Sequence, residues 1–150
     1  MPVLNLKLSP PQTGERRRAI AQALAALSTR ILGKKLPLTA VVIDEPRDWF
    51  IADAPARRPT AFLEIHISAG TNTLLEKESF IEAVFVELQQ QLGELDDVSY
   101  VIVHEVPRGD WGYGGVTQAV RLSAAAAVPH AEVAEAEGPP KLRHIYKVRP

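Results

Sequence analysis

The sequence contains no cysteine, so disulfide bonds and thiolate metal sites are excluded. Its four histidines are the other residues that commonly bind transition metals, and their positions show no ligand spacing. They are His66, His104, His130 and His144. We therefore expect neither a bound metal nor another cofactor.

Charge of one sign and long apolar runs are also scarce. The formal net charge of the 150 residues is −1, and the longest block of like charge is Arg16–Arg18. This balance argues against a nucleic-acid-binding surface. No apolar run approaches the roughly 18 residues of a membrane span, and no charged segment followed by an apolar core indicates a secretory signal. We expect a cytoplasmic, bacterial-type enzyme or binding protein with no nucleic-acid or membrane partner.

The beginning of the chain combines a strand pattern with an unusual second residue. Val3–Leu8 alternates apolar and polar side chains, which predicts a strand with one buried face. Pro2 precedes it directly, and removal of Met1 would leave Pro2 with a free secondary amine. Burial lowers the pKa of an amine, and an α-amine ordinarily titrates near ~8. Pro2 is therefore a candidate base at neutral pH, although Met-Pro starts are also common in proteins that do not use the proline.

The first half of the chain predicts a strand, a helix and a second strand. After Val3–Leu8, a helix is expected over about Gly14–Leu32, with Thr13 as its N-cap and Gly33 as its stop. Thr39–Ile43 is a short apolar run, which we interpret as a buried strand.

The second half repeats this order. Phe62–Ile67 alternates as a strand, Thr73 and Glu76 form a capping-box signature, and the following helix is expected to end near Leu92. Val98–Val103 is a further mostly apolar strand. Six apolar residues of the second helix are expected on its buried face: Phe80, Ile81, Val84, Phe85, Leu88 and Leu92.

The spacing of matching residues indicates an internal duplication. Gly33 and Gly93 lie 60 positions apart, as do Glu45 and Glu105. Each half therefore reads as one β-α-β unit whose two strands are parallel. We predict an α/β (α+β) fold, with a four-stranded sheet and two helices on one face.

This organisation divides the chain into one domain and an extension. The units are expected at about residues 2–58 and 59–122, and residues 123–150 form a C-terminal extension or arm. The helix-free face of the sheet must be covered, and oligomerisation would cover it.

Three features together resemble the tautomerase superfamily, and more narrowly a fused, duplicated 4-oxalocrotonate tautomerase-like protein. They are the Met-Pro start, the β-α-β units near 60 residues, and the sequence Glu-Val-Pro-Arg-Gly-Asp-Trp-Gly-Tyr-Gly-Gly at 105–115. The resemblance covers about residues 2–122. It implies a β-α-β fold, trimers of fused chains, and an amino-terminal proline that moves protons or activates water on small enols and 2-oxo acids.

Carried over residue by residue, the resemblance places the catalytic proline at Pro2. The equivalent position in the second unit falls near Ala61, inside the chain, so one working site per chain is implied. The aromatic wall of the family's pocket falls on Trp111, and on Trp49 in the first unit.

The family's carboxylate-binding arginines are not matched. One of them falls on Gln12 in the first unit and Thr71 in the second. Arg47 and Arg108 lie in the turns before the tryptophans, where either could bind a carboxylate or remain a solvated turn residue. Tyr100 could donate a hydrogen bond to an enolate or belong to the core.

These residues and the resemblance leave three candidate functions. The first is tautomerisation, with neutral Pro2 as a base and Arg108 or Arg47 holding the substrate carboxylate. The second is dehalogenase- or decarboxylase-type hydration chemistry in the same pocket, with protonated Pro2 as an acid. The third is a non-catalytic oligomeric binding protein that retains Met1. The resemblance implies a homotrimer that acts on a small carboxylate or enol.

Overall fold

The computed structural model describes residues 1–127, so the expected arm at 128–150 lies outside the described residues. The larger elements are β1 (Val3–Ser9), α1 (Gly14–Leu32), β2 (Ala40–Asp44), β5 (Thr60–Ser68), α2 (Leu74–Leu92) and β6 (Tyr100–Val106). The smaller ones are η1 (Leu36–Leu38), β3 (Phe50–Ile51), β4 (Ala54–Pro55), β7 (Gly112–Tyr113), β8 (Val116–Thr117) and α3 (Gln118–Ala126). Among residues 1–127, no helix is long and apolar enough to cross a membrane.

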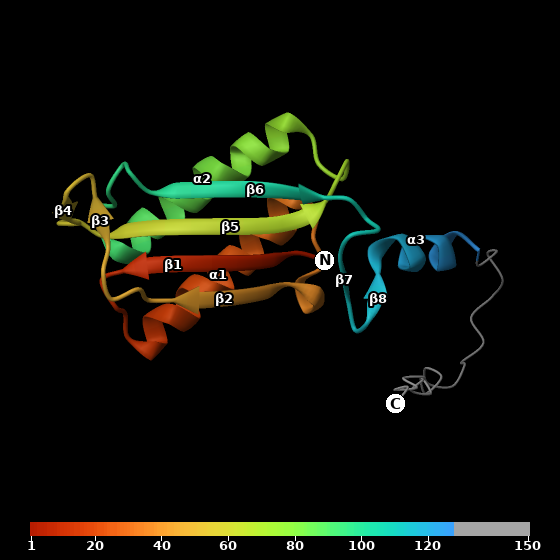
Figure 1. Ribbon diagram of the computed structural model, residues 1–150, viewed down its shortest axis with the longest axis horizontal. Coiled ribbons are helices and arrows are strands. Elements are labelled where there is room, and N and C mark those ends of the chain that lie inside the picture. The colour runs from red at the N-terminus through yellow and green to blue at the C-terminus, as the bar shows by residue number, and fades with distance from the viewer. Residues whose placement is uncertain (128–150) are drawn as a thin grey trace, which may run out of the picture.

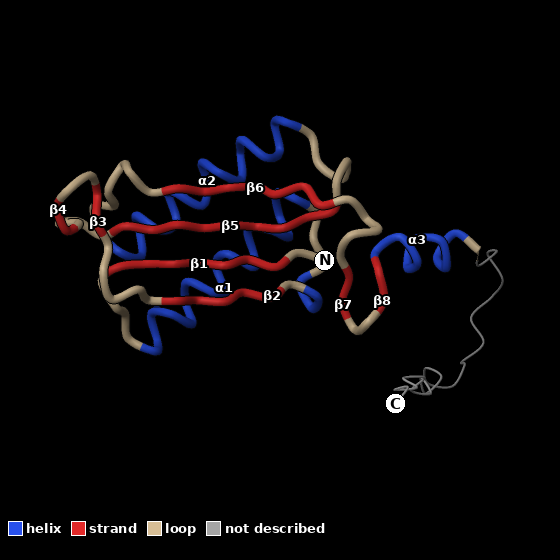
Figure 2. Tube along the Cα trace, in the orientation of Figure 1, coloured by secondary structure: helices blue, strands red, loops and turns tan. Residues whose placement is uncertain are grey.

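The main sheet is mixed, and its strand order is β2-β1-β5-β6. β1 pairs with β2 and β5 with β6 in parallel, whereas β1 and β5 are antiparallel. Both long helices cover one face of the sheet, as predicted (Figure 1). Because β1 and β5 run in opposite directions, the end of β5 lies beside the start of β1. The N-terminus therefore lies at the same end of the strands as the chain that follows β6 (Figure 2).

The helix ends follow the signals in the sequence. The Thr13 hydroxyl accepts a hydrogen bond from the Arg16 backbone N–H at 3.2 Å, and Gly33 ends α1 with a left-handed φ of 65°. In α2, Thr73 and Glu76 form the predicted capping box.

The core lies between the helices and the covered face of the sheet. It contains the inward residues of β1 and β5 and the apolar stripes of both helices. Two expectations were wrong in detail. Ile81 is 40% exposed, because it lies beside the buried stripe of α2 rather than within it. The strand predicted as buried at 39–43 is the edge strand β2, and its outward-facing Val42 is 53% exposed.

The two repeated glutamates have equivalent structural roles. Glu45 accepts a hydrogen bond from the Gln12 backbone N–H at 2.8 Å, in the loop between β1 and α1. Glu105 accepts one from the Gly70 N–H at 3.2 Å, in the loop between β5 and α2. Each also pairs with a cation of the helix that follows its loop. A glutamate at the end of each second strand thus fixes the loop after the first strand.

The helix-free face of the sheet carries a polar cluster at its centre. The rings of His66 and His104 stack with their centroids 4.6 Å apart. His104 Nε2 lies 2.9 Å from a Glu64 carboxylate oxygen. Within residues 1–127, no helix covers this face (Figure 1).

The C-terminal part of the described chain leaves the body of the fold. The β7–β8 hairpin and α3 lie beyond the strand ends of the sheet, next to the N-terminus (Figure 1). α3 buries none of its residues. The domain boundary expected between residues 122 and 123 falls inside this helix.

Candidate active site

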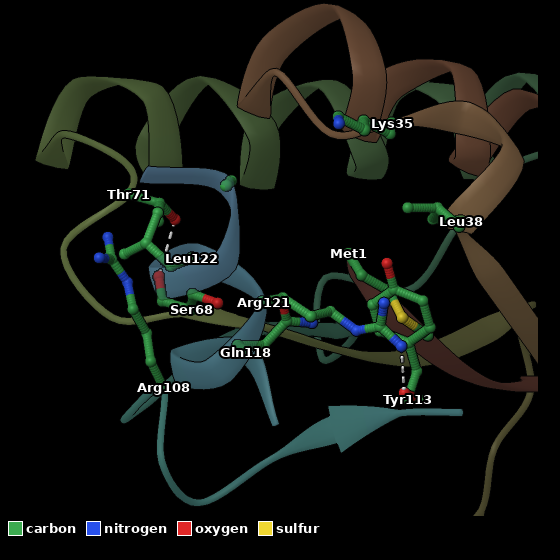
Figure 3. Close-up of a pocket in the computed structure, with 11 residues that line it drawn as sticks. Met1, Lys35, Leu38, Ser68, Thr71, Arg108, Tyr113, Gln118, Arg121 and Leu122 are labelled. Carbon is green, nitrogen blue, oxygen red and sulfur yellow. Dashed lines mark hydrogen bonds between the residues drawn. The ribbon is translucent and has the colours of Figure 1, made fainter. Parts of the chain in front are cut away.

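A cavity of about 410 Å³ lies where β1 begins and where β5 and β6 end. It is bounded by the N-terminus, the loop before β2, the ends of β5 and β6, the hairpin and α3 (Figure 3). Its lining residues are Met1, Lys35, Leu38, Ser68, Thr71, Arg108, Tyr113, Gln118, Arg121, Leu122 and Ala125.

The N-terminal amine is held in a cationic environment at this cavity. Pro2 is buried, and its carbonyl accepts a hydrogen bond from the Ala40 N–H at 3.2 Å, which fixes the start of β1. Burial lowers the pKa of the Met1 amine, and the charges of Lys34 and Lys35 lower it further. An amine at this end of the chain therefore loses its proton more readily than an ordinary α-amine.

Lys34 connects the loop before β2 to the loop after β5. Its ammonium donates hydrogen bonds to the Thr71 hydroxyl at 3.0 Å and to the Asn72 side-chain oxygen at 2.6 Å. The residue is only 9% exposed, and burial lowers the pKa of its ammonium. Lys34 thus brings a positive charge and a fixed loop close to the N-terminus.

The hairpin and α3 supply the other wall of the cavity. The Arg121 guanidinium carbon lies 3.8 Å from the centroid of the Tyr113 ring, and Nη2 donates a hydrogen bond to the Tyr113 carbonyl at 2.8 Å. Gly112 precedes Tyr113 in β7. A Cβ there would overlap the Val116 carbonyl, so the close approach of the two hairpin strands requires glycine.

The structure brings together some of the residues predicted from the sequence. Arg108 lines the same cavity as the N-terminus. Trp111 lies in the same connecting segment but lines a neighbouring cavity of about 300 Å³. Its carbonyl accepts a hydrogen bond from the Gln118 N–H at 3.0 Å, so Trp111 lies next to α3.

The remaining predicted residues lie at the opposite end of the strands, away from this cavity. Trp49 lines a separate cavity of about 360 Å³ together with Phe62, and Arg47 belongs to the same turn. The Tyr100 ring lies 6.5 Å from that of Phe62, at the start of β6. Within one chain these three predicted residues do not reach the cavity at Pro2, so any role there requires a neighbouring copy.

Several residues of the cavity were missed from the sequence. Lys34 and Lys35 read as part of a loop after Gly33. Tyr113 lies in the motif at 105–115 but had no predicted role. Gln118 and Arg121 had no recognisable signal, because the side of α3 that lines the cavity depends on how the hairpin turns the chain back.

Comparison with solved structures shows the fold. A crystal structure of the protein Pt0534, inactivated by 2-oxo-3-pentynoate, is 14% identical with a TM-score of 0.72, covering 79% of this chain and 98% of that one. The "R7 fused 4-OT" wild-type asymmetric trimer is 18% identical with a TM-score of 0.70 and the same two coverages. A macrophage migration inhibitory factor-like protein from Entamoeba histolytica is 21% identical with a TM-score of 0.68, covering 77% and 97%.

No family model and no curated protein matches the sequence. The similar structures are members of the tautomerase superfamily, and they share their fold with most of this chain. The fold that the resemblance implied is therefore confirmed.

Proposed function

We propose that this chain, which has the fold of the tautomerase superfamily, is a tautomerase-like enzyme that uses the free amine of Pro2 after removal of Met1. The observation that carries the proposal is the position of the N-terminus. The Met1 amine lies at a cavity lined by cations, and burial together with Lys34 and Lys35 lowers its pKa. The amine of Pro2 would stand one residue further along, at the start of β1, near the same two lysines. A lowered pKa favours a neutral amine, and so a base, at neutral pH.

In the proposed reaction the amine of Pro2 takes a proton from the enol hydroxyl or the α-carbon of a small 2-oxo acid. It then returns the proton to the neighbouring carbon, so the keto and enol forms are interconverted without a cofactor. The substrate carboxylate is stabilised by the positive lining of the cavity, which includes Lys35, Arg108 and Arg121. A Pro2 amine with its pKa lowered in the same way would disfavour the alternative hydration chemistry, which needs a protonated proline.

We also propose that the chain is a homotrimer. The helix-free face of the sheet contains exposed Val42 and the stacked His66–His104 pair, and a neighbouring copy would cover it. Three of the similar structures are described as fused 4-OT trimers. In such an assembly Arg47, Trp49 or Tyr100 of one copy could approach the Pro2 cavity of another.

The first test is the mass and activity of the protein made at low expression. Under denaturing conditions the mass is expected to lack one methionine, and under native conditions it is expected to equal three chains. The same preparation is expected to ketonise phenylenolpyruvate. Retention of Met1 on essentially all chains would contradict the proline mechanism and favour the non-catalytic binding protein.

The charge of Lys34 gives a second prediction. A base loses activity as the pH falls through its pKa, and Lys34 lowers the pKa of the N-terminal amine. In Lys34→Gln, which can still hydrogen-bond the loop at Thr71, the pKa of the amine rises. The acid limb of the profile of kcat/KM against pH is therefore expected to move to higher pH. Lys7→Gln, at the opposite end of β1, is the control. A limb that stays in place, or moves to lower pH, would contradict this role.

A further inference from the structure

We propose that Arg121 and Gln118 of α3 form the carboxylate-binding site of the cavity, and that Arg121 is the residue that selects an anionic substrate. The identity of the ligand rests on the proposed function, whereas the position of the site rests on the geometry of the hairpin and α3. Neither residue lies in the part of the sequence that resembles the family's binding motifs.

Arg121 is oriented before any ligand arrives. Its guanidinium is stacked on Tyr113, and one terminal nitrogen is bound to the Tyr113 carbonyl. These contacts restrict the side chain, so little rotational freedom is lost when another group binds it. Its Nε–H is buried, and within residues 1–127 this donor has no acceptor. A planar guanidinium with an unused donor suits a carboxylate, which accepts two parallel hydrogen bonds.

Gln118 provides a second donor one helical turn earlier. Residues three apart lie on the same side of a helix, and both side chains line the cavity. The Gln118 side-chain nitrogen is also buried without an acceptor among residues 1–127. Buried donors are normally paired, and the described lining of the cavity contains no aspartate or glutamate that could pair with either of them. A group that enters the cavity with carboxylate oxygens would supply the acceptor that both donors lack.

The position of Arg121 relative to the amine favours it over Arg108. In Figure 3 the Arg121 guanidinium lies with Met1 and Tyr113, whereas the Arg108 side chain lies on the Thr71 side of the cavity. Removal of Met1, which the proposed function requires, would empty space in the cavity that Arg121 lines and would free the amine of Pro2. A 2-oxo acid is short, so its carboxylate and its exchanging proton have to be close to Arg121 and the amine at the same time.

The test measures binding rather than turnover. Equilibrium dialysis with radiolabelled phenylacetate uses a ligand that has a carboxylate and a planar ring but no carbonyl that could react. Arg121→Gln is expected to weaken its binding roughly 10- to 100-fold, as expected for a hydrogen bond to a charged group. Arg121→Lys keeps the charge without the planar fork, and a smaller loss is expected. Gln118→Leu keeps the helix and is expected to cost roughly 3- to 10-fold.

The controls separate this site from the alternatives. Arg18→Gln removes the same charge from the exposed side of α1 and is expected to leave binding unchanged. Phenylacetamide, the neutral analogue, is expected to bind far more weakly than phenylacetate. Three results would each overturn the inference: no saturable binding of phenylacetate, equal binding of the amide, or a larger loss in Arg108→Gln than in Arg121→Gln. Pro2→Ala is expected to keep the binding site, so a failure of the proline mechanism is distinguished from a failure of the carboxylate site.

Discussion

Replacement of Pro2 by alanine is expected to slow the ketonisation of phenylenolpyruvate by roughly 10²- to 10⁴-fold, the contribution of a positioned general base. Alanine at position 2 also permits removal of Met1, so the variant chain still begins with a free α-amine. That amine is primary, and it lacks the ring that fixes the direction of the nitrogen at the start of β1. The comparison is made as kcat/KM at a pH where the wild-type amine is neutral.

A second variant removes the base without altering the proline. An N-terminal extension that is not trimmed keeps Pro2 in a peptide bond, where its nitrogen is an amide without basicity. It is expected to lose at least as much turnover as Pro2→Ala, which keeps a primary amine. Arg18→Gln, on the exposed side of α1, is expected to retain activity. Undiminished turnover in Pro2→Ala, with Met1 removed, would mean that proline is not the base.

The elements of the fold could be predicted from the sequence because their signals are local. Thr13, Gly33, Thr73 and Glu76 mark helix ends through hydrogen bonds within one or two turns, and the structure contains these bonds. The exposure of β2 could not be predicted in the same way. An apolar run fits an interior strand and an edge strand equally well, and only the strand order places β2 at the edge.

The candidate site was only partly predictable, for a geometric reason. The N-terminus and Arg108 line one cavity because the antiparallel pairing of β1 and β5 brings the end of the second unit to the start of the first. The same pairing places Arg47 and Trp49 at the opposite end of the strands. There, the position that the resemblance makes equivalent to Pro2 falls near Ala61, in the interior of the chain. Two similar turns therefore follow two similar units, but within one chain a free amine can face only one of them.

The second large effect is expected in the core, at Phe80. This side chain is fully buried, at 0% exposure, between α2 and the covered face of the sheet. Phe80→Ala removes its contacts and leaves a cavity, and the expected loss in the free energy of unfolding is about 3–5 kcal/mol. Domains of this kind are typically stable by about 5–15 kcal/mol. The variant is therefore expected to unfold at much lower denaturant concentration.

Leu75 on the same helix is the matched control, because it is 70% exposed. Leu75→Ala is expected to change the free energy of unfolding by no more than about 0.5 kcal/mol in the isolated chain. Both variants are measured by denaturant titration at one protein concentration, since the proposed assembly would make stability depend on it. A loss for Phe80→Ala below about 1 kcal/mol would contradict the close packing of α2 on the sheet. A large loss for Leu75→Ala that grows with protein concentration would instead locate Leu75 in a contact between copies.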